Sequence, residues 1–446
     1  MMKHRKLFII TTAITVILFM QPYVTWRSYR YHSYFIALQY AALFTGAVLL
    51  GKHLLENVHS LKKETIYSSV LFFVFAAFYY CTGSESQIGR LGVLAQYIYM
   101  LLLFSADDSC RFESFELLRK VLAILLVPAV IVFFLKAVNV DVPYELLDDY
   151  HPYATTRVYL KYPLSLLAAS VNSIHLPSLR LCGMLDEPGA VGTFVALILC
   201  SCNLNLKDHY NQLLFAAGIC TLSTAFFIII GIYFVMVKLP WQITMKTVKR
   251  RWVILALSAV AVILIDFSSR GIIKIAFGKI FMKLTQEDLR GVNVILEQTY
   301  SEFGRDTLKH LFGDGYFSGV FGGHCSWPVL LHDVGLIGIV LTVLYICFIE
   351  GKNSLKKECL ALRLVMLLSV LQRPYILLIP YVFIYTTGVK MLSEKRYRNS
   401  AEAQVGVFDE RIGADEENCP VYIWPENRRG GSNCQGLFHC AEKKGI

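Results

Sequence analysis

Long apolar runs recur along most of this chain, and they constrain its fold more than any other feature. The runs at 7–20, 121–135 and 226–237 consist mainly of hydrophobic side chains. One globular core could not bury so many apolar segments, whereas a lipid bilayer accepts them. With 55% hydrophobic residues, 17% charged residues and a mean hydropathy of +0.51, the sequence predicts an integral membrane protein.

The charges and the cysteines fit this class. The formal net charge is +10, but the basic residues gather between the apolar runs, where they orient a membrane protein, so nucleic-acid binding is excluded. Many of the 12 cysteines lie in or beside apolar segments, where thiols act as small hydrophobic groups. The basic N-terminus precedes an apolar run with no small-residue cleavage site at 21–23, which favours a first membrane helix over a signal peptide.

Segments long enough to cross about 30 Å of hydrocarbon predict the membrane helices. They lie near 7–25, 35–51, 66–82, 91–105, 118–138, 189–204, 211–238, 252–267, 329–349, 359–372 and 375–392. We expect 211–238 to form two short helices that reverse at 221–224, because this keeps the densest basic cluster, 238–251, on the cytoplasmic side. Hydroxyl side chains at the reversal would satisfy backbone groups at the bend.

The predicted fold is therefore all-α. It is a polytopic integral membrane protein with about 12 transmembrane helices, both ends inside, and two large extracytoplasmic loops near 139–188 and 268–328. Residues 1–392 form this membrane domain. Residues 393–446 are polar and rich in glycine, asparagine and charge, and are expected to be a disordered cytoplasmic tail.

The first outer loop carries tyrosines and ends in an arginine followed by a predicted helix start. The tyrosines either form an interfacial belt or stack on sugar rings. Asp186 and Glu187 precede Pro188, where carboxylates complement exposed backbone N–H groups, so helix capping alone explains both acids. Arg180 either contacts lipid headgroups or binds a phosphate through its forked guanidinium.

The second outer loop begins with an amphipathic segment at 270–283, in which Arg270 and Lys274 are four residues apart. This segment either anchors the loop in the interface or attracts an anionic lipid-linked substrate. Farther along, His324 precedes a predicted membrane helix. An imidazole at such a position is either structural or suited to proton transfer near neutral pH.

Three stretches resemble motifs of the bacterial O-antigen polymerase and ligase superfamily. Residues 180–192 resemble the family's arginine, its glycine and its Glu-Pro-like turn into a helix. Residues 324–338 resemble its histidine, the aromatic residue three positions on and a closing Gly-x-x-Gly, and 311–315 resemble its Leu-hydrophobic-Gly-x-Gly turn. The predicted helix layout is similar too, although Cys325 stands where the family usually has asparagine.

The resemblance implies a polysaccharide polymerase in the bacterial cytoplasmic membrane with its active site on the outer face. It would join undecaprenyl-diphosphate-linked oligosaccharide units into capsule, O-antigen or exopolysaccharide. Implied catalytic residues are His324 as the base, Glu187 as a second candidate base, and Arg180 on the departing diphosphate. The candidate substrate-binding residues are Arg290, Arg305, Arg270 and Lys274. No metal or cofactor is implied, and the expected partners are the lipid-linked oligosaccharide, membrane lipid and a chain-length regulator.

Three other functions remain open on the sequence. A ligase would move a finished glycan onto a lipid or protein acceptor. A transporter or flippase of lipid-linked oligosaccharide would place its charges near the bilayer midplane, whereas here the predicted helices are almost free of charge and cations collect in the outer loops. A receptor or structural protein would depend on none of these side chains.

Overall fold

The computed structural model describes residues 5–25, 30–57, 62–83, 87–147, 157–170, 178–239, 299, 301–304, 306–315, 327–350, 356–373 and 376–394. The chain divides into two units, Met1–Tyr397 and Arg398–Ile446, and all described residues belong to the first. The predicted tail lies outside the described residues except for Ser393 and Glu394, which end the last described helix.

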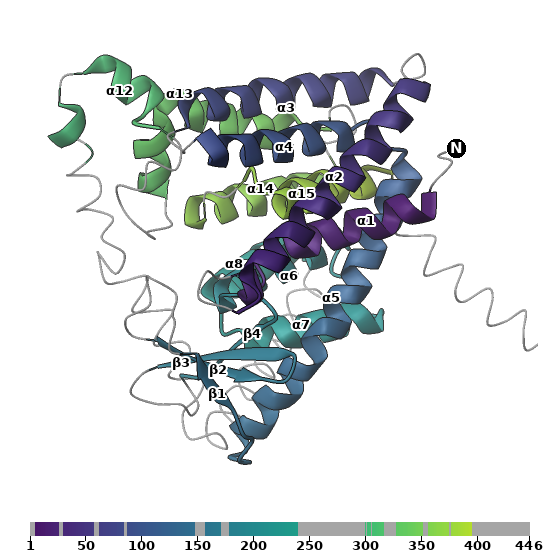
Figure 1. Ribbon diagram of the computed structural model, residues 1–446, viewed down its shortest axis with the longest axis vertical. Coiled ribbons are helices and arrows are strands. Elements are labelled where there is room, and N and C mark those ends of the chain that lie inside the picture. Colours follow the sequence, from purple (N-terminus) through teal and green to yellow (C-terminus); the bar gives the residue numbers. More distant parts are fainter. Residues whose placement is uncertain are drawn as a thin grey trace, which may run out of the picture. The chain divides into compact units, whose positions relative to one another are not determined.

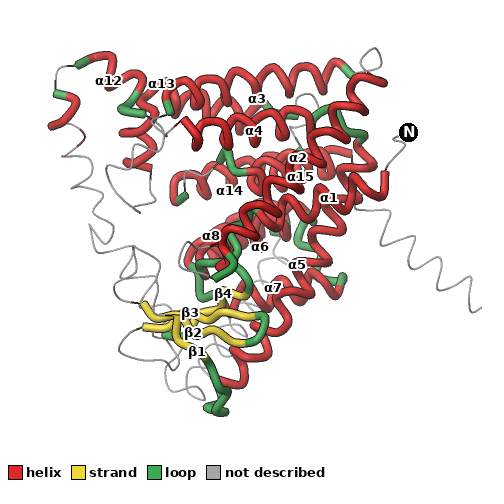
Figure 2. The backbone as a smooth tube through the Cα atoms, viewed as in Figure 1, coloured by secondary structure: helices red, strands yellow, loops and turns green. Residues whose placement is uncertain are grey.

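Most described residues are helical, as the sequence predicts (Figures 1 and 2). The helices are α1 (Arg5–Leu18), α2 (His32–Asn57), α3 (Lys63–Thr82), α4 (Gln87–Leu103), α5 (Asp108–Ala137), α6 (Pro188–Ser201), α7 (His209–Cys220), α8 (Thr224–Val237), α12 (Thr307–Phe312), α13 (Trp327–Phe348), α14 (Lys357–Gln372) and α15 (Ile379–Glu394), with a 3-10 turn, η1, at Tyr23–Thr25. The strands are β1 (Glu145–Leu147), β2 (Arg157–Tyr162), β3 (Ser165–Ser170) and β4 (Arg180–Gly183).

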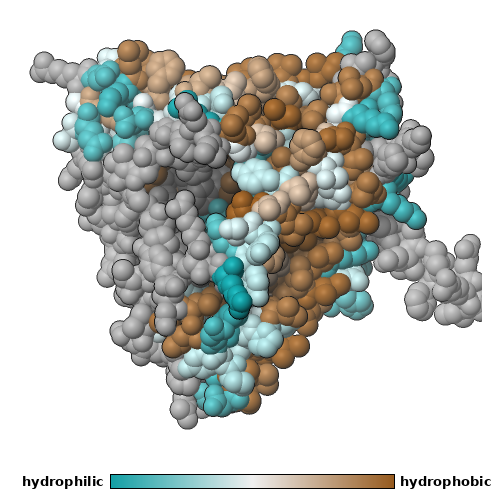
Figure 3. Space-filling view, in the orientation of Figure 1, coloured by the Kyte–Doolittle hydropathy of each residue, from teal (hydrophilic) through white to brown (hydrophobic). Residues whose placement is uncertain are grey.

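Within the described ranges, four helices are long and apolar enough to cross a membrane: α2, α3, α5 and α13. Large apolar side chains on them are exposed, including Phe44 at 70%, Phe73 at 59% and Phe134 at 53%. Hydrophobic residues also cover much of the helical surface visible in Figure 3. Because exposed apolar surface of this kind needs an apolar solvent, the protein is membrane-embedded. The total of about 12 crossings stays a prediction.

The 211–238 stretch forms two helices, α7 and α8, as predicted. The three residues between them include Thr221, whose hydroxyl donates to the carbonyl of Gly218 at 2.6 Å and accepts from the amide of Ser223 at 3.2 Å. A side chain thus satisfies backbone groups at the reversal, which is the role expected for hydroxyl groups there.

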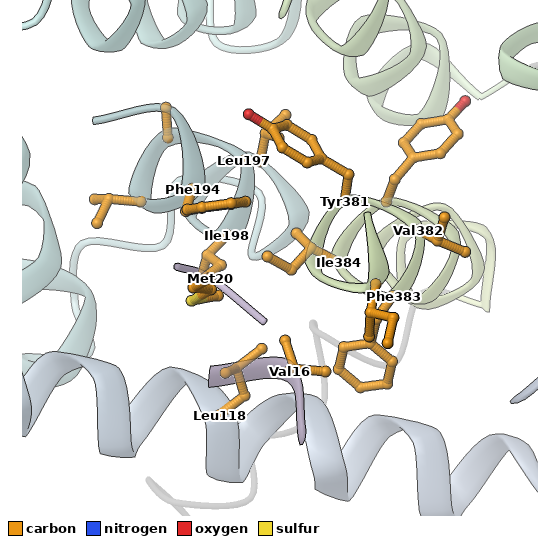
Figure 4. Packing of buried hydrophobic residues seen from close by; sticks show 14 of the residues in the cluster. Val16, Met20, Leu118, Phe194, Leu197, Ile198, Tyr381, Val382, Phe383 and Ile384 are labelled. Carbon is orange, nitrogen blue, oxygen red and sulfur yellow. The ribbon is translucent and has the colours of Figure 1, made fainter. Parts of the chain in front are cut away.

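Helix α6 lies in the centre of the packed helices. Its residues from Pro188 to Ser201 are all buried, because its side chains are apolar on every face. Figure 4 shows Phe194 and Ile198 of α6 near residues of α1, α5 and α15. The ring centroids of Phe194 and Tyr381 are 4.9 Å apart. Helix α6 is therefore enclosed by packing along its whole length.

The all-α prediction is wrong for the first outer loop, which contains a four-stranded antiparallel sheet in the order β1-β2-β3-β4. Alternate side chains of β2 and β3 belong to opposite faces: Leu160 and Leu167 pack with the main core, while Tyr159 and Leu166 pack around Tyr23. The tyrosines of this loop were expected either to form an interfacial belt or to stack on sugar rings, but Tyr159 and Tyr162 are buried. Tyr150 and Tyr153 lie outside the described residues.

Ion pairs join residues that the positive-inside rule assigns to the cytoplasmic side of the membrane. Arg119 of α5 binds Asp208, the N-cap of α7, with Nη1 2.6 Å from Oδ1. Burial raises the pKa of the Asp208 carboxyl, but hydrogen bonds from Arg119 and from two backbone amides outweigh burial, so this pKa lies below its ordinary value of 3.8. Asp208 therefore stays ionised and keeps both α5 and the start of α7 in place.

A second, more deeply buried network lies on the same predicted side. Arg111 of α5 donates to Glu350 at 3.0 Å, and these side chains are 4% and 3% exposed. Lys390 of α15 lies 3.8 Å from Glu350, and Arg111 also donates to the hydroxyl of Thr386 at 3.3 Å. The backbone amide of Glu350 donates to Ser68 of α3 at 3.1 Å. Charged side chains thus connect α3, α5 and α15 to the end of α13.

Candidate functional site

Two of the seven predicted site residues, Arg180 and Glu187, are described by the structure. The other five lie outside the described residues: His324, Arg270, Lys274, Arg290 and Arg305. The convergence of Arg180 and His324 on one substrate therefore stays a prediction. What the structure adds is the surroundings of Arg180 and Glu187.

The backbone between β4 and α6 is fixed on two sides. Gly183 ends β4 with a φ of 65°, and a β-carbon there would lie 2.4 Å from Leu126 of α5, so glycine allows both the turn and the close contact. On the other side, the amide of Tyr23 donates to Met184 at 3.0 Å and that of Asp186 donates to Gln21 at 3.2 Å. The segment that carries Arg180 and Glu187 is thus anchored to α5 and to the turn after α1.

Arg180 begins β4 and contacts the end of α7. Its Nε donates to the carbonyl of Thr221 at 3.0 Å, and Thr221 is the C-cap residue of that helix. A cation is favourable there because helix C-terminal carbonyls carry partial negative charge. The contact uses one of five N–H donors of the guanidinium. Arg180 therefore has a structural role, whatever else it binds.

Glu187 does not cap helix α6 as the capping interpretation predicts, and its candidate role as a base stays a prediction. It is the N-cap residue of α6, but its carboxylate does not cap the helix. Instead, Oε2 of Glu187 lies 2.5 Å from Nη2 of Arg373, the C-cap residue of α14. The interpretation of this acid as a simple capping residue is therefore wrong. Its sequence neighbour Asp186 is buried, with 8% of its surface exposed.

Two glycines bring these groups to one face of α6. A β-carbon at Gly189 would lie 2.6 Å from Nη2 of Arg373 and 3.4 Å from Oε1 of Glu187. A β-carbon at Gly192 would lie 3.0 Å from Oγ1 of Thr221, whose carbonyl binds Arg180. Positions three apart on a helix lie on the same side, about 5–6 Å from each other.

Sequence reasoning missed Arg373. One sequence signal could have indicated it. Arg373 lies on the short segment between the last two predicted helices, which the positive-inside rule assigns to the outer side, and lysine and arginine are disfavoured on that side. No local pattern links it to Glu187, because 186 residues separate the two. The structure thus pairs Glu187 with Arg373 at the first turn of α6, and it places Thr221, the partner of Arg180, beside Gly192 of the same helix.

The glycine motif at 311–315, in the predicted second outer loop, meets the Gly-x-x-Gly at 335–338 at a break in α13. Gly335 has φ 60° and ψ −168° inside this helix, so the carbonyls of His332 and Asp333 do not continue a regular helix. The amides of Asp314 and Gly315 donate to these carbonyls at 2.9 and 3.0 Å. The 311–315 turn therefore caps the broken helix, which gives both motifs a structural reason.

A cluster of ionisable side chains surrounds this break. The ring of His332 is buried, with Nε2 3.2 Å from Glu302 and Nδ1 3.3 Å from Asp333, and it stacks on Phe303 at 5.3 Å between centroids. On the turn itself, Nζ of Lys309 lies 3.0 Å from Asp314. None of these residues was a candidate before. The contacts of His332 hold Glu302 and Phe303 against α13, and the Lys309–Asp314 pair links α12 to the turn that follows it.

Replacing Gly335 with alanine is expected to destabilise the protein by about 2–3 kcal/mol, because the backbone conformation is one that only glycine adopts readily and the new β-carbon would lie 2.5 Å from the Leu311 carbonyl. Unfolding in detergent measures this. The matched control is Gly231→Ala in α8, where a β-carbon meets nothing within 4 Å, so the free energy of unfolding should stay equal or rise. Equal stability of the two variants would contradict the capped break.

Comparisons with known proteins add no family to this picture. A scan against protein-family models, a search of curated proteins and a search of solved structures each find no match.

Proposed function

We propose that this protein is a membrane glycosyltransferase that polymerises undecaprenyl-diphosphate-linked oligosaccharide repeat units into capsule, O-antigen or exopolysaccharide. The observation that carries the proposal is the ion pair of Glu187 with Arg373 at the start of the buried helix α6, with Arg180 bound to Thr221 beside the same helix. A polyanionic, lipid-linked donor needs cations on a rigid element at the membrane boundary, and this group provides them.

The reaction we propose is a direct displacement at the anomeric carbon of the donor. The acceptor hydroxyl oxygen bonds to that carbon as the bond to the diphosphate oxygen breaks, and His324 takes the hydroxyl proton, with Glu187 as the second candidate base. Undecaprenyl diphosphate leaves with the bonding electron pair, and Arg180 stabilises its growing charge. Arg270, Lys274, Arg290 and Arg305 are the further substrate-binding candidates.

The positions of the buried charged side chains near helix ends weigh against the transporter alternative. This reason differs from the one drawn from the sequence, which was that the predicted helices are almost free of charge. The described helices are not almost free of charge, since Arg111, Arg363 and Lys390 are buried in them, and Glu350 is buried just after α13. However, these side chains lie near helix ends: Arg363 binds the carbonyls of Ile346 and Ile349 at the end of α13, at 3.2 and 2.8 Å. Substrate sites of transporters instead lie near the bilayer midplane. The break in α13 at Gly335, with buried His332 and Asp333 beside it, is the described feature that favours a transporter.

Reconstitution into liposomes with lipid-linked repeat units tests the proposal. We expect a ladder of products that differ by one repeat unit, separated on a gel after lipid release. A single addition to a foreign lipid or protein acceptor, without a ladder, would favour a ligase. Movement of the lipid-linked unit between leaflets with no new glycosidic bond would replace the proposal with a transporter.

A further inference from the structure

The ion pair between Glu187 and Arg373 is the feature that the proposed mechanism leaves unexplained. Nη2 and Oε2 are 2.5 Å apart, and the side chains are 12% and 25% exposed. Such a partly buried pair contributes little net stability compared with two apolar side chains of similar size, because both charges lose water. Stability alone is thus a weak reason for a charged pair at this position.

The location of Arg373 is more informative than its pairing. Its guanidinium lies over Gly189, and the residue that binds Arg180, Thr221, lies beside Gly192 one helical turn further. Arg373 and the partner of Arg180, Thr221, therefore contact the same helix, α6, although β4 carries Arg180 and the end of α14 carries Arg373. A diphosphate has two phosphoryl groups, and each of them can accept hydrogen bonds from a forked guanidinium group.

The pairing of Arg373 with a carboxylate suggests how a donor would bind. A carboxylate and a phosphate offer a guanidinium similar geometry, but a diphosphate carries more negative charge and more acceptor oxygens. Glu187, at 25% exposed, is the more accessible member of the pair. The carboxylate therefore occupies a position that a phosphate can take.

We propose that Arg373 is a second diphosphate-binding residue, and that the donor's phosphate displaces Glu187 from it when the donor binds. This inference rests on the proposed function and names the residue that grips the second phosphoryl group. It has a distinctive consequence: Glu187 competes with the donor for Arg373, so removing the negative charge of Glu187 strengthens binding.

The experiment measures binding of undecaprenyl diphosphate to the full-length protein in nanodiscs by native mass spectrometry, with undecaprenyl monophosphate as the comparison lipid. We expect Arg373→Gln to weaken diphosphate binding about tenfold, as loss of one charge-assisted pair would. We expect Glu187→Gln to strengthen it several-fold while it slows polymerisation. The double variant E187Q/R373Q should bind undecaprenyl diphosphate as weakly as Arg373→Gln alone. Without Arg373, Glu187 and the diphosphate no longer compete for the same guanidinium, so removing the charge of Glu187 has no further effect.

The double variant is also the control for folding, because two neutral amides can hydrogen-bond where the two charges stood. Its melting temperature should equal that of the wild type. If Arg373 only holds the fold, Glu187→Gln will not strengthen binding and the Arg373 variants will bind as the wild type does, which would overturn the inference and leave the polymerase proposal intact. A wild-type protein that binds neither lipid would overturn both.

Discussion

Alanine at position 180 is expected to reduce the formation of polymer ladders by about a hundredfold to a thousandfold. This is the loss seen when one preorganised donor to a developing anion is removed, and Arg180 is the proposed donor to the departing diphosphate. The measurement is the initial rate of ladder formation in liposomes at equal amounts of folded protein. A ladder from Arg180→Ala that matches the wild type would remove Arg180 from the mechanism.

The structural role of Arg180 must be separated from this effect, because its Nε also binds the Thr221 carbonyl at the end of α7. Arg180→Gln keeps an N–H donor for that carbonyl but has no charge, so it should fold normally and still lose the ladder. Arg180→Lys keeps the charge without the fork and should retain intermediate activity.

A matched arginine elsewhere in the chain sharpens the comparison. Arg90 of α4 donates at 2.6 Å to the carbonyl of Gly83, the C-cap residue of α3, as Arg180 does for α7. Arg90→Ala therefore removes the same kind of helix-end contact at a position with no proposed chemistry. It should retain full polymerisation, and a loss equal to that of Arg180→Ala would show that helix-end contacts alone explain the phenotype.

The parts of the fold that were predictable from sequence are those with local causes. Apolar run length predicted helices, and the need to return the 238–251 basic cluster to one side predicted the division of α7 from α8. The sheet was not predicted because the tyrosines of this segment indicated only a tyrosine-rich surface. In β2, Leu160 and Tyr162 face one side and Tyr159 and Lys161 face the other, which is the alternation typical of a strand. Its two buried faces were not considered.

The candidate site was less predictable because its contacts are non-local. The motif after β4 drew attention to Arg180 and Glu187, but capping was a sufficient local explanation for the acid, and only the folded chain brings Arg373 to it. Likewise, the two glycine motifs looked like separate turns. Their common purpose, capping the break at Gly335 with the 311–315 turn, needs both segments in space.

Replacing Glu350 with alanine is expected to lower the free energy of unfolding by about 3–5 kcal/mol, the largest effect on stability that we predict. Glu350 is 3% exposed and lies 3.0 Å from Arg111 and 3.8 Å from Lys390. Its removal leaves the buried guanidinium of Arg111 without its carboxylate partner, whereas Lys390 keeps Glu64 at 3.6 Å and Asp108 at 3.8 Å. The desolvation cost of Arg111 is then no longer offset. Denaturant unfolding in detergent, followed by tryptophan fluorescence, measures the change.

Two controls decide whether charge burial is the cause. Changing both partners to apolar residues, Arg111→Met with Glu350→Leu, should return the free energy of unfolding to within about 1 kcal/mol of the wild type, because no uncompensated charge remains in that pair. Glu113→Ala removes the partner of Arg5 in an exposed pair, with side chains 49% and 26% exposed, and should cost less than about 1 kcal/mol. If Glu350→Ala and Glu113→Ala cost the same, water reaches the Arg111 network and the desolvation argument fails. If the double apolar variant is as unstable as Glu350→Ala, lost packing is responsible, and the network stabilises the helices by shape rather than by charge.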